Sequence, residues 1–239
     1  MRINYGYIKV VLLLVLVVFL YAFSSIRNAT RLVETPVVKF IDEDNLFVTH
    51  ETVSKLLIQN LESVTNKPKD SIDLNRLESA LNSNSMIKQA QVFMSVNGLI
   101  TAEIEQKKPI ARVNTNASYY IDNSGSFMPL STNRTARVPL ITGVVEKNDL
   151  ANVHAVASKI QNDDFLTKHV VVIHQNRDKT IDLIFRGHDF DIHLGTLKLL
   201  DKKINNLKAF YKKAMKDKTL DNYKLVNLKF DKQVICTKK

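Results

Sequence analysis

Residues 90–104 read AQVFMSVNGLITAEI, two alternating apolar runs on either side of an Asn-Gly pair. A period of two is typical of β-strands, whose successive side chains point to opposite faces of a sheet. The pair Asn97-Gly98 favours a tight type I′ turn, in which both central residues have positive φ. The segment therefore predicts a β-hairpin. Its alternating apolar residues are Ala90, Val92, Met94 and Val96 before the turn, and Ile100, Ala102 and Ile104 after it.

Two amphipathic helices are predicted upstream of the hairpin, after a short strand at residues 37–41. Thr49 is placed to cap the first helix and Asp73 to cap the second, with residues 66–69 breaking the chain between them. Ile72 and Leu77 are spaced for a hydrophobic staple. The apolar stripes are Val53, Leu56, Leu57 and Leu61 on the first helix, and Leu74, Leu77 and Leu81 on the second. This order predicts a compact three-stranded sheet covered by two helices.

The N-terminus carries the most apolar segment of the chain. Residues 10–23 are all apolar, and between residues 7 and 26 the only polar residues are Lys9, Ser24 and Ser25. This wider stretch is long enough for one transmembrane helix. We predict a cytoplasmic tail at residues 1–6, a span at 7–26 and a linker at 27–36. The residues expected to anchor the span are Val10, Leu14, Val17 and Leu20.

A cleaved signal peptide is the alternative interpretation of the same segment. Arg2 and Lys9 would form its basic region, residues 10–23 its apolar region, and Ala22-Phe23-Ser24 a loose cleavage site. The span length favours a retained anchor.

The region after Pro109 is predicted to be α+β and rich in antiparallel strands. Its expected strands lie at residues 111–113, 118–121, 168–174, 179–185, 188–194 and 223–234, and its helices at 148–160 and 196–216. The second helix is basic, because residues 198–218 contain eight Lys against two Asp. Such a face can meet anionic lipid, nucleic acid or an acidic protein, or it can simply be solvated.

The sequence contains no motif that points to catalysis. One cysteine, Cys236, cannot form an internal disulfide or a zinc finger, and with 6 Gly the chain has no Gly-rich phosphate loop. Asp189, Asp191 and His193 would share a strand face and form the best cation candidate, although an exposed polar strand face is the simpler explanation. Aromatic residues are too sparse on the basic helix for a base-stacking surface. We therefore expect no enzyme, no cofactor, no metal, no small-molecule substrate and no nucleic acid.

Several short stretches, taken in order behind one anchor, resemble the FtsQ/DivIB family of bacterial cell-division proteins. They lie at residues 86–92, 105–112, 120–125, 128–131 and 138–143, and their amino-acid sequences most resemble those of members from Bacteroidota. The resemblance implies a POTRA-like β-α-α-β-β domain at residues 37–108 and a β-rich FtsQ-type domain at 109–239.

The resemblance also implies a partner surface. In this family the final strands bind the FtsB–FtsL pair, largely by β-augmentation, beside a motif that resembles D-L-R-Y. Here it reads Asn227-Leu228-Lys229-Phe230. Lys cannot form a bidentate fork to a carboxylate and Phe lacks a hydroxyl, so the side-chain contacts would differ, whereas backbone pairing at the strand edge would survive. The expected partner-binding residues are Leu228, Lys229, Phe230 and Lys232, although Phe230 could instead belong to the core.

These expectations define a non-enzymatic, single-pass scaffold of bacterial cell division. It would lie in the cytoplasmic membrane at the septum, with its N-terminus in the cytoplasm and its large domains outside. Its partners would be FtsB- and FtsL-like proteins and, through the N-terminal helix, the lipid bilayer. One alternative is an outer-membrane-assembly or secretion component, although these usually carry several POTRA copies. The other is an anchored hydrolase, although no nucleophile and base are paired in the sequence.

Overall fold

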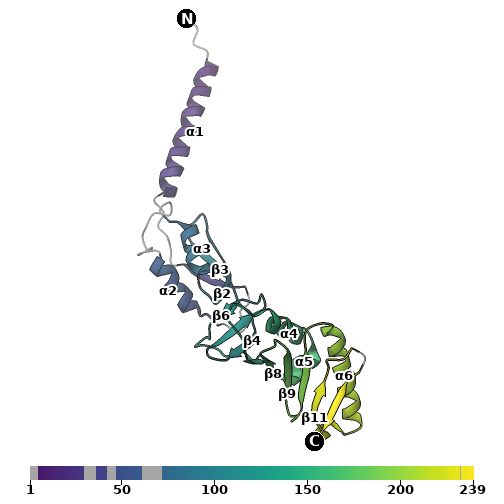
Figure 1. The fold of residues 1–239 in the computed structure, drawn as a ribbon. Coiled ribbons are helices and arrows are strands. Elements are labelled where there is room, and N and C mark those ends of the chain that lie inside the picture. Colours follow the sequence, from purple (N-terminus) through teal and green to yellow (C-terminus); the bar gives the residue numbers. More distant parts are fainter. Residues whose placement is uncertain (1–4, 30–35, 42–46, 61–71, 232) are drawn as a thin grey trace. The chain divides into compact units, whose positions relative to one another are not determined.

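The computed structural model describes residues 5–29, 36–41, 47–60, 72–231 and 233–239. It divides into two compact units, residues 1–106 and 107–239, and each contains its own hydrophobic core. Figure 1 shows the helices and strands of both units. The predicted α+β class is confirmed. The domain boundaries drawn from the sequence stay a prediction.

The first helix, α1, spans Tyr5–Ala29 and contains the whole predicted span. Residues 6–27 are long and apolar enough to cross a membrane, and none of the helix is buried inside the protein. Most of the predicted tail and linker lies outside the described residues.

The rest of the first unit has the predicted β-α-α-β-β order. The three strands form a sheet in the order β1-β3-β2. β1 pairs in parallel with the central strand β3, and β2 pairs with the other side of β3 in antiparallel orientation. Both predicted caps are confirmed, because Thr49 Oγ1 accepts from the N–H of Thr52 and Asp73 Oδ1 accepts from the N–H of Arg76. Leu61 lies outside the described residues. The elements are β1 Val37–Phe40, α2 His50–Asn60, α3 Leu74–Asn82, β2 Ile87–Met94 and β3 Ile100–Gln106.

The hairpin forms where predicted, but its turn differs. The N–H of Gly98 donates to the carbonyl of Ser95, and the N–H of Ser95 donates to the carbonyl of Leu99. Gly98 has φ 87°, whereas Asn97 is not among the non-glycine residues with positive φ. The predicted two-residue type I′ turn is therefore wrong. The loop is one residue longer and ends on a left-handed glycine, which leaves Val96 in the turn and exposed instead of on the buried strand face.

In the second unit, nine strands of the described chain form one sheet in the order β12-β11-β10-β9-β8-β7-β4-β5-β6. The strands are β4 Pro109–Asn114, β5 Ser118–Asp122, β6 Phe127–Met128, β7 Leu140–Gly143, β8 Val170–Gln175, β9 Ile181–Phe185, β10 Asp191–Gly195, β11 Tyr223–Asn227 and β12 Ile235–Lys238. The helices are α4 Ala151–Gln161, α5 Asp164–His169, α6 Leu200–Lys216 and the short 3-10 helix η2 Leu220–Asn222.

The helices of this unit supply one side of its core. Val153, Val156 and Ile160 on α4 and Ile204 and Leu207 on α6 are buried in the same cluster as the strand residues. Leu183, Phe185, Ile192 and Val226 represent the buried strand face. The alternate residues of these strands are half-buried or exposed.

Three sequence-based assignments in this unit need correction. The single final strand predicted at residues 223–234 is wrong, because β11 ends at Asn227 and a separate strand, β12, begins at Ile235. The strand predicted at 188–194 begins only at Asp191, so His188 lies outside it. Helix α5 precedes β8, and the start of the strand predicted at 168–174 is its last turn.

Candidate functional site

The large sheet has two edges, and they differ. At one edge, β6 is two residues long, and its Phe127 carbonyl accepts a hydrogen bond from Lys107 Nζ at 3.0 Å. Lys147 Nζ also lies over the Phe127 ring, 3.7 Å from its centroid. Short strands and lysines are two ways in which natural proteins block a sheet edge. This edge is therefore poorly suited to receive another strand.

At the other edge, β12 is four residues long and pairs only with β11, antiparallel, from Tyr223–Lys238 to Asn227–Ile235. Its second backbone edge has no strand partner, and no side chain hydrogen-bonds to the backbone of β12 within the described part of the chain. Ile235, Thr237 and Lys238 are exposed and Cys236 is half-buried. Burial raises the pKa of the Cys236 thiol. An extended segment could add to this edge through backbone hydrogen bonds.

Strand β11 is ended by its own last residues. Asn227 Oδ1 accepts a hydrogen bond from the N–H of Lys229 at 3.0 Å, which turns the chain out of the strand. The N–H of Leu228 donates to the carbonyl of His193 on β10 at 2.9 Å, and the Leu228 side chain is buried. We call residues 228–234, which join β11 to β12, the β11–β12 connection.

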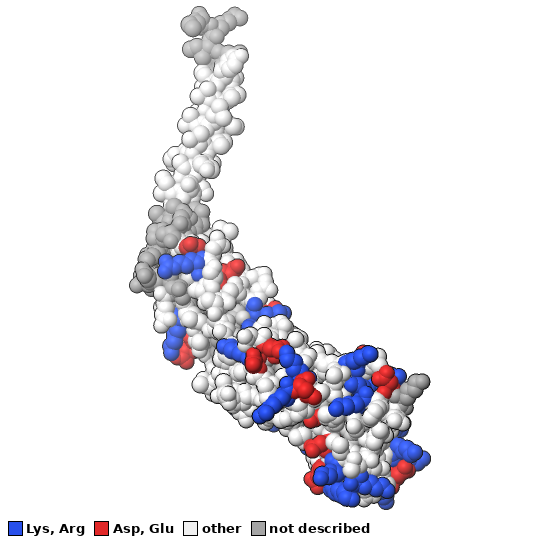
Figure 2. Space-filling view, viewed as in Figure 1, with Lys and Arg blue, Asp and Glu red and all other residues white. Residues whose placement is uncertain are grey.

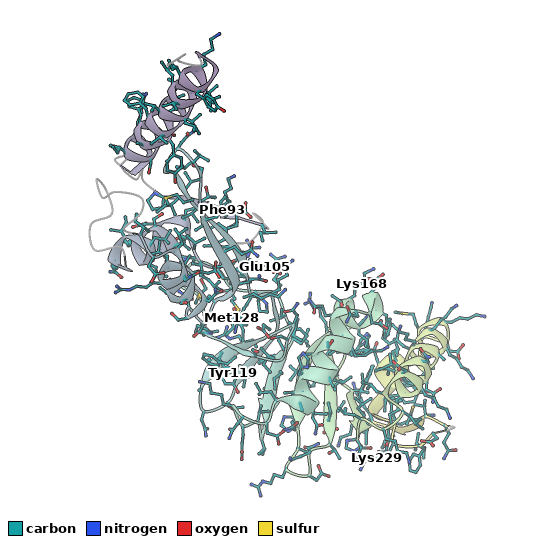
Figure 3. The ribbon with its side chains drawn as sticks, turned by 90° about the horizontal axis from the view of Figure 1, so that it is seen from above. Phe93, Glu105, Tyr119, Met128, Lys168 and Lys229 are labelled. Atoms are coloured by element: carbon teal, nitrogen blue, oxygen red, sulfur yellow. The ribbon has the colours of Figure 1, made fainter. Side chains whose placement is uncertain are left out.

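The expected partner-binding residues lie in this connection and not on the edge strand. Leu228 belongs to the core. Lys229 runs across Gly195, since a Cβ on that glycine would lie 2.9 Å from Lys229 Cγ. Phe230 is 45% exposed, so the alternative that it belongs to the core is wrong. Lys232 lies outside the described residues. Figure 3 labels Lys229 in the C-terminal unit.

A buried lysine fixes the turn beneath the connection. Lys203 on α6 is 4% exposed, and its Nζ donates to the carbonyls of Leu194 and Thr196 at 2.9 and 2.7 Å. Desolvation lowers the pKa of Lys203, the nearby carboxylate of Asp231 opposes that shift and the charge of Lys229 adds to it. The turn after β10 therefore has a fixed shape where Lys229 crosses it.

The surface around this edge is basic. Figure 2 shows Lys and Arg gathered over the part of the molecule that holds α6 and the C-terminus. Among the described residues, most of these lysines form no ion pair: Lys198, Lys202, Lys212, Lys213, Lys216, Lys218, Lys224 and Lys238. Such a surface attracts an acidic partner and repels a basic one.

The cation candidate from the sequence does not assemble. His193 Nδ1 hydrogen-bonds to Asp182 on the neighbouring strand, and Lys239 Nζ lies 3.5 Å from Asp189. His188 Nε2 hydrogen-bonds to the Tyr211 hydroxyl at 3.1 Å. In the described chain, no group of three or more His, Cys, Asp or Glu side chains could hold a metal ion. Asp191 and His193 lie on β10, whereas Asp189 precedes the strand.

The expected anchor residues Val10, Leu14, Val17 and Leu20 all lie on α1 and are exposed. An apolar helix with no protein around it suits a lipid environment. Their anchoring role stays a prediction.

Sequence reasoning missed β12 itself. The segment is short, and only its β-branched residues Ile235 and Thr237 favour a strand. Its position at the edge depends on pairing with β11, which no local signal reports.

Comparison with known families gives two matches. Residues 108–237 match the family model described as FtsQ/DivIB, C-terminal related. Residues 38–105 match the model of a POTRA-like domain. A search of the curated proteins finds no match.

Proposed function

This chain belongs to the FtsQ/DivIB family, and from that premise we propose that it is a non-enzymatic, single-pass scaffold of bacterial cell division. The family domains support a scaffold role in division, and α1 supports a membrane anchor. The N-terminus lies in the cytoplasm, and the part of the chain that follows α1 lies on the outer side of the membrane. The protein acts at the septum, where it recruits or regulates an FtsB–FtsL-like pair.

The observation that carries the proposal is the open edge of β12. A partner strand that adds there gains a row of backbone hydrogen bonds, and side chains of the β11–β12 connection select the partner. Phe230 in the connection and Ile235 at the start of β12 provide exposed apolar contacts. Lys229 and Lys232 add positive charge, so we expect the binding segment of the partner to be acidic.

A pull-down with the FtsB–FtsL-like pair tests this surface. Phe230→Asp removes an apolar contact and brings a negative charge toward an acidic partner, so we expect binding to fall at least tenfold. Lys229→Glu should also weaken binding. The matched control is Val144→Asp, since Val144 is 48% exposed and follows β7, five strand positions from β12. At the usual spacing that is about 24 Å away. Circular dichroism checks that each variant is folded.

Cys236 offers an independent probe, because it is the one cysteine of the chain and lies on β12. Addition of a partner strand should slow its reaction with a maleimide. Unchanged binding by Phe230→Asp and Lys229→Glu, together with an unchanged Cys236 rate, would exclude this surface. A fluorescent fusion tests the cellular role, since uniform envelope staining would contradict recruitment to the septum.

A further inference from the structure

The tip of the β2–β3 hairpin is an uncharged surface with exposed apolar side chains. No residue from Gln91 to Ala102 carries a charge. Val96, in the turn, is 76% exposed, and Phe93, near the end of β2, is 45% exposed. Met94 and Leu99 are half-buried beside them. We call residues 93–99 the hairpin tip.

The opposite end of the same hairpin is charged. Lys88 and Glu105 form an ion pair of 2.6 Å there, between β2 and β3. The register places Phe93 opposite Thr101 and Gln89 opposite Glu105, so the two ends are four residues apart along the strands. Phe93 and Glu105 are labelled in Figure 3. The sheet therefore changes from charged to uncharged along its length, toward the tip.

The topology places the hairpin tip at the end of the sheet where the chain enters from α1. β1 is parallel to β3, and Val37, its first residue, pairs with Thr101, which pairs in turn with Phe93. Val37 is itself exposed. Only the seven residues 30–36 separate it from the last residue of α1. The eight steps from residue 29 to residue 37 span at most about 29 Å, so the end of the sheet that carries the tip cannot lie far from the end of the helix.

We propose that the hairpin tip contacts the interfacial layer of the membrane that α1 crosses. Insertion there buries Val96 and Phe93 without desolvating any charged side chain, whereas the other end of the hairpin would have to bury Lys88 and Glu105. The contact gives the three-stranded sheet a second attachment to the membrane, besides residues 30–36 that join it to α1. It therefore limits the orientation of the sheet relative to the membrane. This inference rests on the membrane anchor of the proposed function and not on partner binding at β12.

Single tryptophans in the full-length protein test the contact, because the natural chain contains no Trp. Val96→Trp places a probe in the tip at an exposed position, so folding is unaffected. Gln89→Trp is the matched control, exposed on the same face of β2 as Phe93 and about 13 Å from it along the strand. Both proteins are reconstituted into phosphatidylcholine–phosphatidylglycerol vesicles, with and without brominated acyl chains.

We expect brominated lipid to quench Val96→Trp at least twofold and to leave Gln89→Trp unchanged. Because Trp itself favours the interface, Phe93→Ser is added to Val96→Trp, and it should bring quenching down toward the Gln89→Trp level. Quenching that is equal at positions 96 and 89, or absent from both, would overturn the proposal. A blue-shifted but unquenched Val96→Trp would also overturn it, because that result means contact with protein.

Leu14→Trp, in the middle of α1, separates this inference from the anchor on which it rests. Strong quenching of Leu14→Trp with none of Val96→Trp rejects the tip contact and keeps the anchor. An unquenched Leu14→Trp rejects both.

Discussion

Gly143→Ala tests the tightest backbone approach in the large sheet. Gly143 ends β7 with φ +91°, and a Cβ built on it would lie 2.1 Å from the carbonyl oxygen of Gln175 on the neighbouring strand β8. An ordinary contact needs 3.4 Å or more, so Gln175 would have to move by more than an ångström. That residue is held in place: its carbonyl accepts from the N–H of Val144 at 2.9 Å, and its Nε2 donates to the Val144 carbonyl at 2.7 Å.

The expected loss of stability has two parts. A left-handed backbone costs an alanine about 1–2 kcal/mol. Breaking one or two of the hydrogen bonds between Val144 and Gln175 adds about 1 kcal/mol each. The total is about 2–4 kcal/mol. Gly187→Ala is the matched control, because Gly187 has φ +73° and nothing within 4 Å of its Cβ position. It should lose only the backbone part.

Urea unfolding of a fragment of residues 107–239, followed by circular dichroism, measures both losses. This fragment contains one whole core, which favours a two-state transition. We expect the midpoint to fall by roughly 1–2 M for Gly143→Ala and by clearly less for Gly187→Ala. Equal midpoints for the two variants would refute the close approach of β7 and β8.

Two further substitutions test other polar contacts. Asn82→Ala removes the side chain that donates to the carbonyl of Ala90 and accepts from its N–H on the edge strand β2, so the exchange of the Ala90 amide should accelerate at least tenfold. The Val92 amide, held by Glu78, is the internal control. Asp163→Asn tests the ion pair between Asp163 before α5 and Lys208 on α6. Burial raises the pKa of Asp163. The Lys208 ammonium and the N–H groups of Leu166 and Phe165 outweigh this effect and hold the pKa below 3.8. The carboxylate therefore stabilises the fold above about pH 4, and this stabilisation is lost as the pH falls through the folded pKa. We expect the free energy of unfolding of Asp163→Asn to lie roughly 1 kcal/mol below that of the natural protein at pH 7. This difference, measured by urea unfolding, should shrink toward pH 3. A difference that does not change with pH would contradict this account.

The first unit could be predicted closely because its signals are local. Thr49 and Asp73 each cap a helix by accepting from an N–H three residues further on, and the helical stripes are visible within single segments. The turn at residues 95–99 differs from the prediction because strand pairing overrides the local signal there. Asn-Gly suits a two-residue loop, but the pairing of Met94 with Ile100 fixes a longer one.

The second unit was less predictable because its strand order is not local. Neighbours in the sheet such as β10 and β11 are joined in parallel across α6, and no periodicity shows which strands pair. The α5 helix is only six residues long. Asp163 caps it by accepting from the N–H groups of Phe165 and Leu166, so the sequence contained a signal for the start of this helix. Short elements such as α5 and β12 give too few residues for a period to emerge.

The segment Asn227–Phe230 does not continue the final strand, as the sequence had predicted. As a strand, it would expose Lys229 on one face and Leu228 with Phe230 on the other. Instead the Asn227 side chain captures the N–H of Lys229 and ends β11, so the next residues leave the sheet. Leu228 turns into the core and Phe230 toward solvent.

The same departure changes how Lys229 can act. Its aliphatic stem crosses Gly195, a contact for which the glycine is required, because a Cβ there would lie only 2.9 Å from Lys229 Cγ. A lysine stem can lie along a surface while its ammonium stays in water. The segment thus has a structural role, which is to end β11 and orient the connection, in addition to any contact with a partner. It follows that Lys229→Glu and Phe230→Asp are not equivalent tests of binding: the first also alters packing on Gly195, whereas the second changes only an exposed side chain and gives the cleaner answer.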